Sequence, residues 1–464
     1  MTATVEARWG SAELDALALE TGVAVLRDPS SLRAASGDFG GLVRGNAAGL
    51  ALPRDAAEVT AIVAFAQREG LRVTPRGRGL SQSGQSVPPD GALSLDLRRL
   101  DRVGEVEAPP GESPRIACGA GARFRDVVIR ASRRGLLPRV APLNLDLTVG
   151  GVVSVGGVGA TTHAHGPIVS RVPELVAVTG LGETVTATRT ERREVLDAAL
   201  AGLGRAVIIC QVALELRPFA PRVTTFQLLY DDAGRFLHDQ RSLAFAPERA
   251  PEYLEAFVVA SPHSPGVRFF ALHASYEHER GAPPTDEQVL RDVAPYRRSR
   301  GPELDTLAFA SRYEPRFEAM VRTGAWELAH PWVEAFLPAE SLGELLPRVL
   351  AELPPFLGDG HRILLFRNHD LPPFLAVPSG AAELAAFAIL PVGVPAGVQD
   401  DARLALLRAD RILREAGGKR YLSGWLGPMD EDAWKAHHGP RHHAWLEAKR
   451  TLDPRGIFTS SLFT

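Results

Sequence analysis

A short glycine-rich segment is the first part of this chain that could bind a charged ligand. Residues 76–81 read RGRGLS and follow a predicted strand at residues 71–74. Glycine has no Cβ atom, so Gly77, Gly79 and the later Gly84 let backbone N–H groups approach a phosphate closely. The segment is not the G-x-G-x-x-G fingerprint, and no predicted helix begins on its last glycine, which disfavours a nicotinamide-binding Rossmann unit.

A second glycine-rich segment lies at residues 147–166, with the sequence LTVGGVVSVGGVGATTHAHG. Many glycines in an apolar stretch indicate tight turns or the close approach of a flat ligand. The alternative is a connection that only packs on a sheet. Two such segments in one half of the chain favour a large cofactor.

Two other clusters contain residues that could do chemistry. His437, His438, His442 and His443 suggest zinc, but no Cys or carboxylate completes a ligand set. We therefore expect solvated histidines and no metal site. Asn368 follows an apolar strand at residues 363–366 and could reach the roof of an active site; a simple turn at the strand end is the alternative.

Strands and helices are expected to alternate in the first half of the chain. A helix begins at about Asp55, because apolar residues recur at positions 59, 62, 63 and 66. The pattern changes near residues 218–221, which indicates a boundary. The other expected elements are strands at 49–52, 71–74, 93–97, 115–118, 207–216, 225–229 and 268–273, a hairpin at 174–188, and helices at 124–134, at 400–416 and from 441.

The composition excludes several classes of protein. The chain has 464 residues, 45% of them hydrophobic and 23% charged, with a formal net charge of −3, which fits a globular protein without a basic surface for nucleic acid. No apolar run approaches the ~18 residues of a membrane span, and the N-terminus lacks the features of a signal peptide. We expect a cytoplasmic protein whose Cys118 and Cys210 are buried free thiols.

An ordered set of short motifs resembles the cytokinin dehydrogenases, which belong to the vanillyl-alcohol-oxidase-like flavoproteins with a PCMH-type FAD-binding domain. The resemblance covers nearly the whole chain. The motifs are SGDFG at 36–40, RGRGLS at 76–81, LTVGG at 147–151, HGP at 165–167, GLG at 202–204, HPW at 330–332, YL at 421–422, Trp434 with His437 and Gly439, and DP at 453–454.

The resemblance implies an α+β fold with an inserted domain. Residues 1–221 would form the FAD-binding domain, and residues 222–415 would form an α+β substrate-binding domain with an antiparallel sheet and helices. Residues 416–464 would return to the FAD-binding domain. The residues that would contact FAD are Arg76, Gly77, Arg78, Gly79, Leu80, Ser81, Gln85, Thr148, Gly150, Gly151, Ser154, Gly157, Ile208 and Tyr421.

Two positions depart from the family pattern. Leu80 stands where the family has the histidine that bonds covalently to the flavin, so the resemblance implies FAD held non-covalently. Leu143 stands where the family has the aspartate that takes a proton from the substrate, four residues before the LTVGG motif. A leucine cannot act as a base. Asn144 and Asp146 are close, but neighbouring residues on a strand would point to opposite faces.

Two carboxylates remain as candidate catalytic residues. Asp146 would serve after a local shift of register. Glu334 lies two residues beyond Trp332, which the resemblance places in the wall of the substrate pocket. Asn368 is a second candidate for contact with the substrate, because of its place after the apolar strand. On a strand, Glu334 and Trp332 would share one face.

The prediction is an FAD-dependent oxidoreductase that oxidises a C–N or C–O bond of a small molecule by hydride transfer to flavin N5. Oxygen or another acceptor would reoxidise the flavin, and a tailoring role in secondary metabolism is one hypothesis. The alternatives are a cytokinin or amine dehydrogenase that uses Asp146, a flavin-binding protein that has lost redox catalysis, and glycine segments that are only structural. The expected partners are a small-molecule substrate and an electron acceptor, with neither nucleic acid nor membrane.

Overall fold

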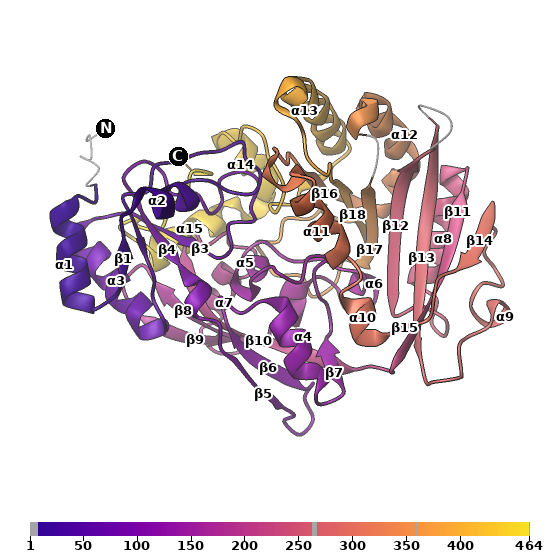
Figure 1. Ribbon diagram of the computed structural model, residues 1–464, viewed down its shortest axis with the longest axis horizontal. Helices are drawn as coiled ribbons and strands as arrows, with labels where there is room; N and C mark the ends of the chain where they lie inside the picture. Colours follow the sequence, from indigo (N-terminus) through magenta and orange to yellow (C-terminus); the bar gives the residue numbers. More distant parts are fainter. Residues whose placement is uncertain (1–7, 262–266, 358–359, 464) are drawn as a thin grey trace.

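Three β-sheets and the helices that cover them make up the computed structural model, which describes residues 8–261, 267–357 and 360–463 (Figure 1). The combination of helices with mainly antiparallel sheets confirms the predicted α+β class. The helices are α1 (Ser11–Thr21), α2 (Pro29–Ala35), α3 (Ala56–Glu69), α4 (Phe124–Ser132), α5 (Val149–Val153), α6 (Thr162–His165), α7 (Arg193–Ala199), α8 (Ala233–Ala244), α9 (Asp286–Val289), α10 (Thr306–Ala310), α11 (Glu314–Arg322), α12 (Leu342–Glu352), α13 (Gln399–Glu415), α14 (Glu431–His438) and α15 (His442–Leu452).

The first sheet carries the first glycine-rich segment. Its four strands have the order β1 (Val25–Leu26), β2 (Gly49–Ala51), β4 (Leu93–Asp96) and β3 (Val73–Arg76). Helix α3 connects β2 to β3, and Asp55 caps its N-terminus by accepting a hydrogen bond from the backbone N–H of Glu58 at 2.9 Å. Strand β3 therefore delivers the chain directly into residues 77–86.

Strand β3 runs two residues further than the sequence predicted. The expected strand ended at Thr74, but Pro75 and Arg76 both belong to β3. A proline lacks the N–H of a sheet ladder, and β3 lies at the end of the strand order, where that loss is tolerated.

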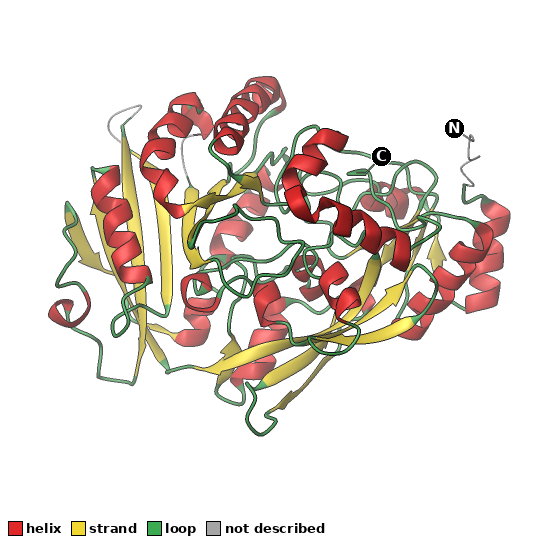
Figure 2. Cartoon of the chain, turned by 180° about the vertical axis from the view of Figure 1, so that it is seen from behind, coloured by secondary structure: helices red, strands yellow, loops and turns green. Residues whose placement is uncertain are grey.

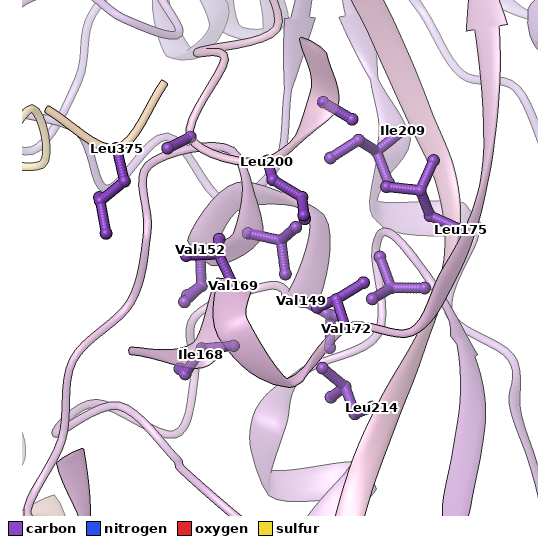
Figure 3. Packing of buried hydrophobic residues seen from close by; sticks show 14 of the residues in the cluster. Val149, Val152, Ile168, Val169, Val172, Leu175, Leu200, Ile209, Leu214 and Leu375 are labelled. Carbon is purple, nitrogen blue, oxygen red and sulfur yellow. The ribbon is translucent and has the colours of Figure 1, made fainter. Parts of the chain in front are cut away.

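The second sheet supports the other glycine-rich segment. All its strand pairs are antiparallel, and its order is β5 (Val103–Glu107), β6 (Arg115–Gly119), β10 (Val207–Pro218), β8 (Glu174–Thr179) and β9 (Thr184–Thr188), with β7 (Leu136–Pro138) also paired to β10. The hairpin expected at 174–188 is β8 and β9. Figure 3 shows Val149 of the glycine-rich segment on the side of Leu175 and Leu214 of this sheet, and Val152 on the other side, beside Ile168 and Val169; all belong to one apolar core.

The third sheet is the largest and lies at the opposite end of the molecule from α1 (Figure 1). Its strand pairs are all antiparallel. The order is β14 (Arg297–Arg300), β11 (Arg222–Tyr230), β13 (Arg268–His278), β12 (Tyr253–Ala260), β17 (His361–Arg367), β18 (Glu383–Ile389), β16 (Val333–Pro338) and β19 (Lys419–Arg420), with β15 (Leu304–Asp305) paired to β11.

Side chains on this third sheet alternate between two environments. Val333, Ala335 and Leu337 of β16 join the apolar core formed with α8, α12 and α13. Phe336 lies on the other face and joins the core of the second glycine-rich segment. Because neighbouring residues on a strand point to opposite faces, the even-numbered residue Glu334 also faces the glycine-rich segments.

The C-terminal segment packs back on the N-terminal half. Helix α15 contacts α7, and Phe458 forms a parallel bridge to Val73 of β3. Figure 2, in which the second sheet runs below the centre, shows how much of the region above that sheet consists of loops. The proposed domain bounds remain a prediction; β19, within the segment assigned to residues 416–464, pairs with the third sheet.

The histidine pair of α14 differs from the expectation of solvated side chains, whereas in α15 His443 is exposed, as expected, and His442 is half-buried. His437 and His438 are buried, and the ring of His438 stacks on Trp445 at 4.4 Å between centroids. Trp434 and His438 are four residues apart, so they share the helix face that packs against α15. Burial lowers the pKa of His438 to about 3. Within the described ranges, no group of three or more His, Cys, Asp or Glu side chains could hold a metal ion.

Two other sequence-based expectations concern the thiols and the membrane. Cys118 and Cys210 are free and buried, as predicted. In the part of the chain that the structure describes, no helix is both long and apolar enough to span a membrane.

Candidate active site

One cavity joins the two glycine-rich segments to the third sheet. Residues 75–82 and much of 142–158 form one side, and Glu334, Arg362, Leu364 and Ala388 form the other. Tyr421 and Ser423 of the C-terminal segment close it. The cavity therefore collects residues from four separate parts of the sequence. Every residue predicted to contact FAD lines it: Arg76, Gly77, Arg78, Gly79, Leu80, Ser81, Gln85, Thr148, Gly150, Gly151, Ser154, Gly157, Ile208 and Tyr421.

The first segment presents backbone donors that the protein does not use. None of the backbone N–H groups of residues 78–82 finds a hydrogen-bond acceptor among the described residues. Gly79 has a φ of +68°, a conformation that glycine adopts without strain. A run of free N–H groups in such a loop is suited to the oxygens of a diphosphate.

The two glycine-rich segments touch each other at Gly77. A Cβ atom on Gly77 would lie 2.3 Å from Oγ1 of Thr148, which is too close for any real contact. Thr148 in turn precedes α5, and Gly150 lies so near Ala120 that a Cβ would approach its Cβ to 2.6 Å. Glycine is needed at both positions, because the backbone of Gly77 lies against the Thr148 side chain and that of Gly150 lies against Ala120.

Asp38 holds the first glycine-rich segment in place through hydrogen bonds, a role that the sequence did not lead us to expect. Its Oδ2 accepts hydrogen bonds from Ser81 Oγ at 2.9 Å and from the backbone N–H of Gly84 at 2.8 Å. Burial raises the pKa of Asp38 to about 6. The SGDFG motif at 36–40 was the available signal, because an acidic residue between two glycines is suited to bind a loop.

Arg76 and Gln85 line the cavity, but their side chains donate hydrogen bonds to backbone carbonyl oxygens of the protein. Arg76 donates to the carbonyl oxygens of Ser86 at 3.0 Å and Ala34 at 2.9 Å. Gln85 Nε2 donates to the carbonyl oxygens of Leu422 at 2.9 Å and Gly424 at 3.2 Å. Both side chains thus hold the loop in place, and Arg78 is the exposed arginine at the cavity.

Tyr421 joins the C-terminal segment to the second glycine-rich segment. Its hydroxyl accepts a hydrogen bond from the backbone N–H of Gly157 at 2.7 Å, and its ring lies 4.8 Å from that of Phe336. Burial raises the pKa of this tyrosine, so its hydroxyl stays protonated. Tyr421 is therefore a fixed wall of the cavity.

Glu334 and Arg362 lie in one row across the third sheet. Glu334 of β16 is paired with Ala388 of β18, and Ala388 is paired with Arg362 of β17. Directly paired residues project to the same face, and two strand spacings separate the outer pair by about 10 Å between backbones. The small Ala388 leaves open space between the two charged side chains.

Glu334 has the environment of a group that exchanges protons near neutral pH. It accepts a hydrogen bond from Ser423 Oγ. Burial raises the pKa of Glu334 to about 7, while the Ser423 hydroxyl and the charge of Arg362 act in the opposite direction. A carboxylate at a cavity wall with a pKa near 7 is suited to general acid–base chemistry.

Aromatic rings form the remaining wall. Phe39 lies 4.7 Å from Trp326 and 5.3 Å from Trp332, measured between ring centroids, and all three line the cavity. The indole N–H of Trp332 donates to the carbonyl oxygen of Pro391 at 2.8 Å, which fixes the ring. The wall is apolar and rigid, and is suited to a flat or aliphatic group.

The structure does not bring Asp146 or Asn368 to this cavity. Residues 143–146 form a turn in which Asn144 Oδ1 accepts from the backbone N–H of Asp146 at 2.9 Å, so the expected strand geometry is wrong here. Asp146 points to Arg125, whose Nη2 lies 3.2 Å away. Asn368 is exposed and its amide donates to the carbonyl oxygen of Ala381, as in a strand-end turn.

Residues 47–188 match the FAD binding domain family. The match spans both glycine-rich segments, including the unused backbone donors of the first. The chain is an FAD-dependent oxidoreductase, and its sequence is similar to those of cytokinin dehydrogenases. The fit to FAD rests on the cavity itself: glycines where side chains would collide, free N–H groups at residues 78–82, and an apolar wall for a flat ring.

Relatives that match most of the chain agree with this assignment. An uncharacterized oxidoreductase, ORF5 in the fasciation locus of Rhodococcoides fascians, is 27% identical over 93% of this chain and 96% of its own length. Cytokinin dehydrogenase 6 of Oryza sativa subsp. japonica is 27% identical over 93% of this chain and 89% of its own. Cytokinin dehydrogenase 4 of Arabidopsis thaliana is 28% identical over 70% of each chain.

The contact at Gly77 gives a test of the FAD site. We expect Gly77→Ala to weaken FAD binding by about 5- to 150-fold, because a clash of this kind costs about 1–3 kcal/mol. Titration of the apoprotein with FAD measures the change. Gly343→Ala is the matched control, since its Cβ would meet nothing within 4 Å, and it should bind FAD like the unaltered protein. Equal affinities for both variants would contradict the assignment.

Proposed function

We propose that this oxidoreductase removes a hydride from a C–N or C–O bond of a small molecule, with Glu334 as the general base. The observation that carries the proposal is the position of Glu334, a carboxylate with a pKa of about 7 in the wall of the cavity that has the FAD-binding loops on its other side. The sequence alone offered Asp146 equally, and its ion pair with Arg125 leaves Glu334 as the better candidate.

The proposed reaction is a two-electron oxidation. FAD, when bound, supplies the hydride acceptor. The substrate loses a hydride from carbon and a proton from nitrogen or oxygen, and a C=N or C=O bond forms. Glu334 accepts the proton on its carboxylate, and the aromatic wall of Phe39, Trp326 and Trp332 orients the substrate body. Oxygen or another acceptor then takes the two electrons from the reduced protein.

The substrate can be sought by anaerobic reduction. A panel of amines and alcohols is mixed with the purified holoenzyme without oxygen, and loss of the visible flavin absorbance reports turnover. We expect at least one class of compound to bleach the flavin. Reduction by dithionite alone would favour the alternative of a flavin-binding protein that has lost redox catalysis. We propose a substrate other than a cytokinin, because Leu143 occupies the position of the usual base.

We also infer that FAD is held without a covalent bond. Leu80 lines the cavity at the position of the family's histidine, and its side chain has no atom that could form the bond. Acid precipitation should therefore leave a colourless pellet and release free FAD into the supernatant. Colour that stays with the pellet would contradict this inference and indicate attachment through another residue.

A further inference from the structure

A group of buried charges lies on the third sheet beside the cavity. Glu255 of β12 is only 3% exposed and accepts hydrogen bonds from Arg312 Nη2 at 2.6 Å and Tyr313 Oη at 2.8 Å. It also accepts one from Arg362 Nη2. The Glu255 carboxylate thus pairs with two guanidinium groups. The three charged side chains together carry a net charge of +1.

The excess charge is presented at the cavity by Arg362. Arg362 lines the cavity, whereas Arg312 and Glu255 do not. Its Nη2 is bonded to Glu255 and, at 3.2 Å, to Tyr313 Oη. Its Nε and Nη1 have no hydrogen-bond partner among the described residues. The side chain is nevertheless largely buried, with only 8% of its surface exposed. Unpaired donors on a desolvated cation are costly unless a ligand meets them.

The guanidinium group is held ready for a ligand. Its carbon lies 5.2 Å from the ring centroid of Phe257 and 5.0 Å from that of Tyr313. Contacts on two rings and a fixed Nη2 restrict its motion, so little freedom is lost on binding. Glu334 is the acidic group that faces Arg362 across Ala388. Because its pKa is about 7, Glu334 is largely protonated below pH 7 and then does not compensate the positive charge of Arg362.

We propose that Arg362 binds a carboxylate of the substrate, which makes the substrate a small organic acid with an aromatic or aliphatic body. The inference rests on the proposed function in that it assigns the substrate class of the same cavity. The carboxylate meets Arg362, and the apolar body lies against Phe39, Trp326 and Trp332. The oxidised carbon then lies between Arg362 and Glu334, over the small Ala388.

The test uses benzoate and benzamide, two probes of the same shape that differ in charge. Each is titrated into the holoenzyme, and the shift of the flavin absorption spectrum gives the Kd. We expect benzoate to bind at least 10-fold more tightly than benzamide. In Arg362→Met the affinity for benzoate should fall at least 10-fold, while that for benzamide changes less than 2-fold. Arg367→Met is the matched control, because Arg367 ends the same strand in an exposed position away from the cavity, and it should leave both affinities unchanged.

Three outcomes would overturn the inference. The first is equal affinity of the unaltered enzyme for the two probes, which is decisive even if Arg362→Met does not fold. The second is unchanged benzoate binding in Arg362→Met. The third is a loss of bound FAD in that variant with benzoate binding retained, as measured by titration calorimetry, which would assign Arg362 to the cofactor.

The binding test is separate from the test of the proposed function. Benzoate binding that depends on Arg362, in a protein that no donor except dithionite reduces, would uphold the inference and reject the proposed oxidation. A second result would uphold the proposed oxidation and reject the carboxylate inference. It is turnover of neutral amines or alcohols that depends on Glu334, in an enzyme that binds benzoate no more tightly than benzamide.

Discussion

Replacing Glu334 by glutamine should lower kcat by about 10²- to 10⁴-fold, the usual contribution of a general base. Glutamine has the shape of glutamate and can still accept the hydrogen bond from Ser423, so the cavity and its bound FAD should be retained. The measurement is the rate of anaerobic flavin reduction by a substrate found in the screen. A variant that keeps more than a tenth of the original rate would exclude Glu334 as the base.

The pH profile gives an independent check of the same residue. A base acts in its ionised form, so kcat/KM should rise with pH up to about 7, the pKa of Glu334, and then level off. Asp38, with a pKa of about 6, also titrates near this range, but Glu334→Gln keeps Asp38 and should lose the rise. In Ser423→Ala the rise should move to higher pH, because the lost hydrogen bond lowers the pKa of Glu334 in the unaltered protein.

Replacing Glu255 by glutamine should destabilise the protein by about 3–5 kcal/mol, because a buried ion group that loses one partner leaves uncompensated charge. Two guanidinium groups, of Arg312 and Arg362, would then face a neutral amide. The free energy of unfolding is measured by urea denaturation of the holoenzyme, followed by tryptophan fluorescence. The matched control is Glu344→Gln, which breaks an exposed pair with Arg348 and should cost less than about 1 kcal/mol.

The same carboxylate predicts how stability depends on pH. Burial alone would raise the pKa of Glu255, but Arg312 and Arg362 lower it below its usual range. A lowered pKa means that the unfolded chain binds the proton more readily, so the contribution is present above the unfolded pKa of about 4.3 and is lost as the pH falls through the folded pKa. Equal destabilisation by Glu255→Gln and Glu344→Gln would contradict both the large contribution of Glu255 to stability and its predicted dependence on pH.

The sequence was informative wherever local chemistry decides the structure. Glycines at positions 77 and 79 predicted the cofactor loop, because their conformation and lack of a side chain are properties of single residues. The helix after Asp55 followed from the spacing of its apolar residues, and the hairpin at 174–188 from its turn sequence. The α+β class, FAD and the oxidoreductase assignment were all confirmed.

The contacts that the sequence did not predict are those made between distant segments. The pairing of Glu334 with Ala388 and of Ala388 with Arg362 depends on the register of three strands, which no local pattern specifies. The charge group around Glu255 likewise joins residues 57 and 107 positions apart. His437 and His438 were expected in solvent because their polarity was weighed without the tryptophans that cover them.

The attachment of the cofactor loop to the end of the chain has a consequence for how the protein is made. Strand β3 is bridged by Phe458, and Gln85 is tied to the carbonyl oxygens of Leu422 and Gly424. These partners lie more than 330 positions after Gln85 in the sequence, so the ribosome makes them much later than the loop. We therefore expect the loop to reach its final form, and to bind FAD, only after residues 422–458 have been translated.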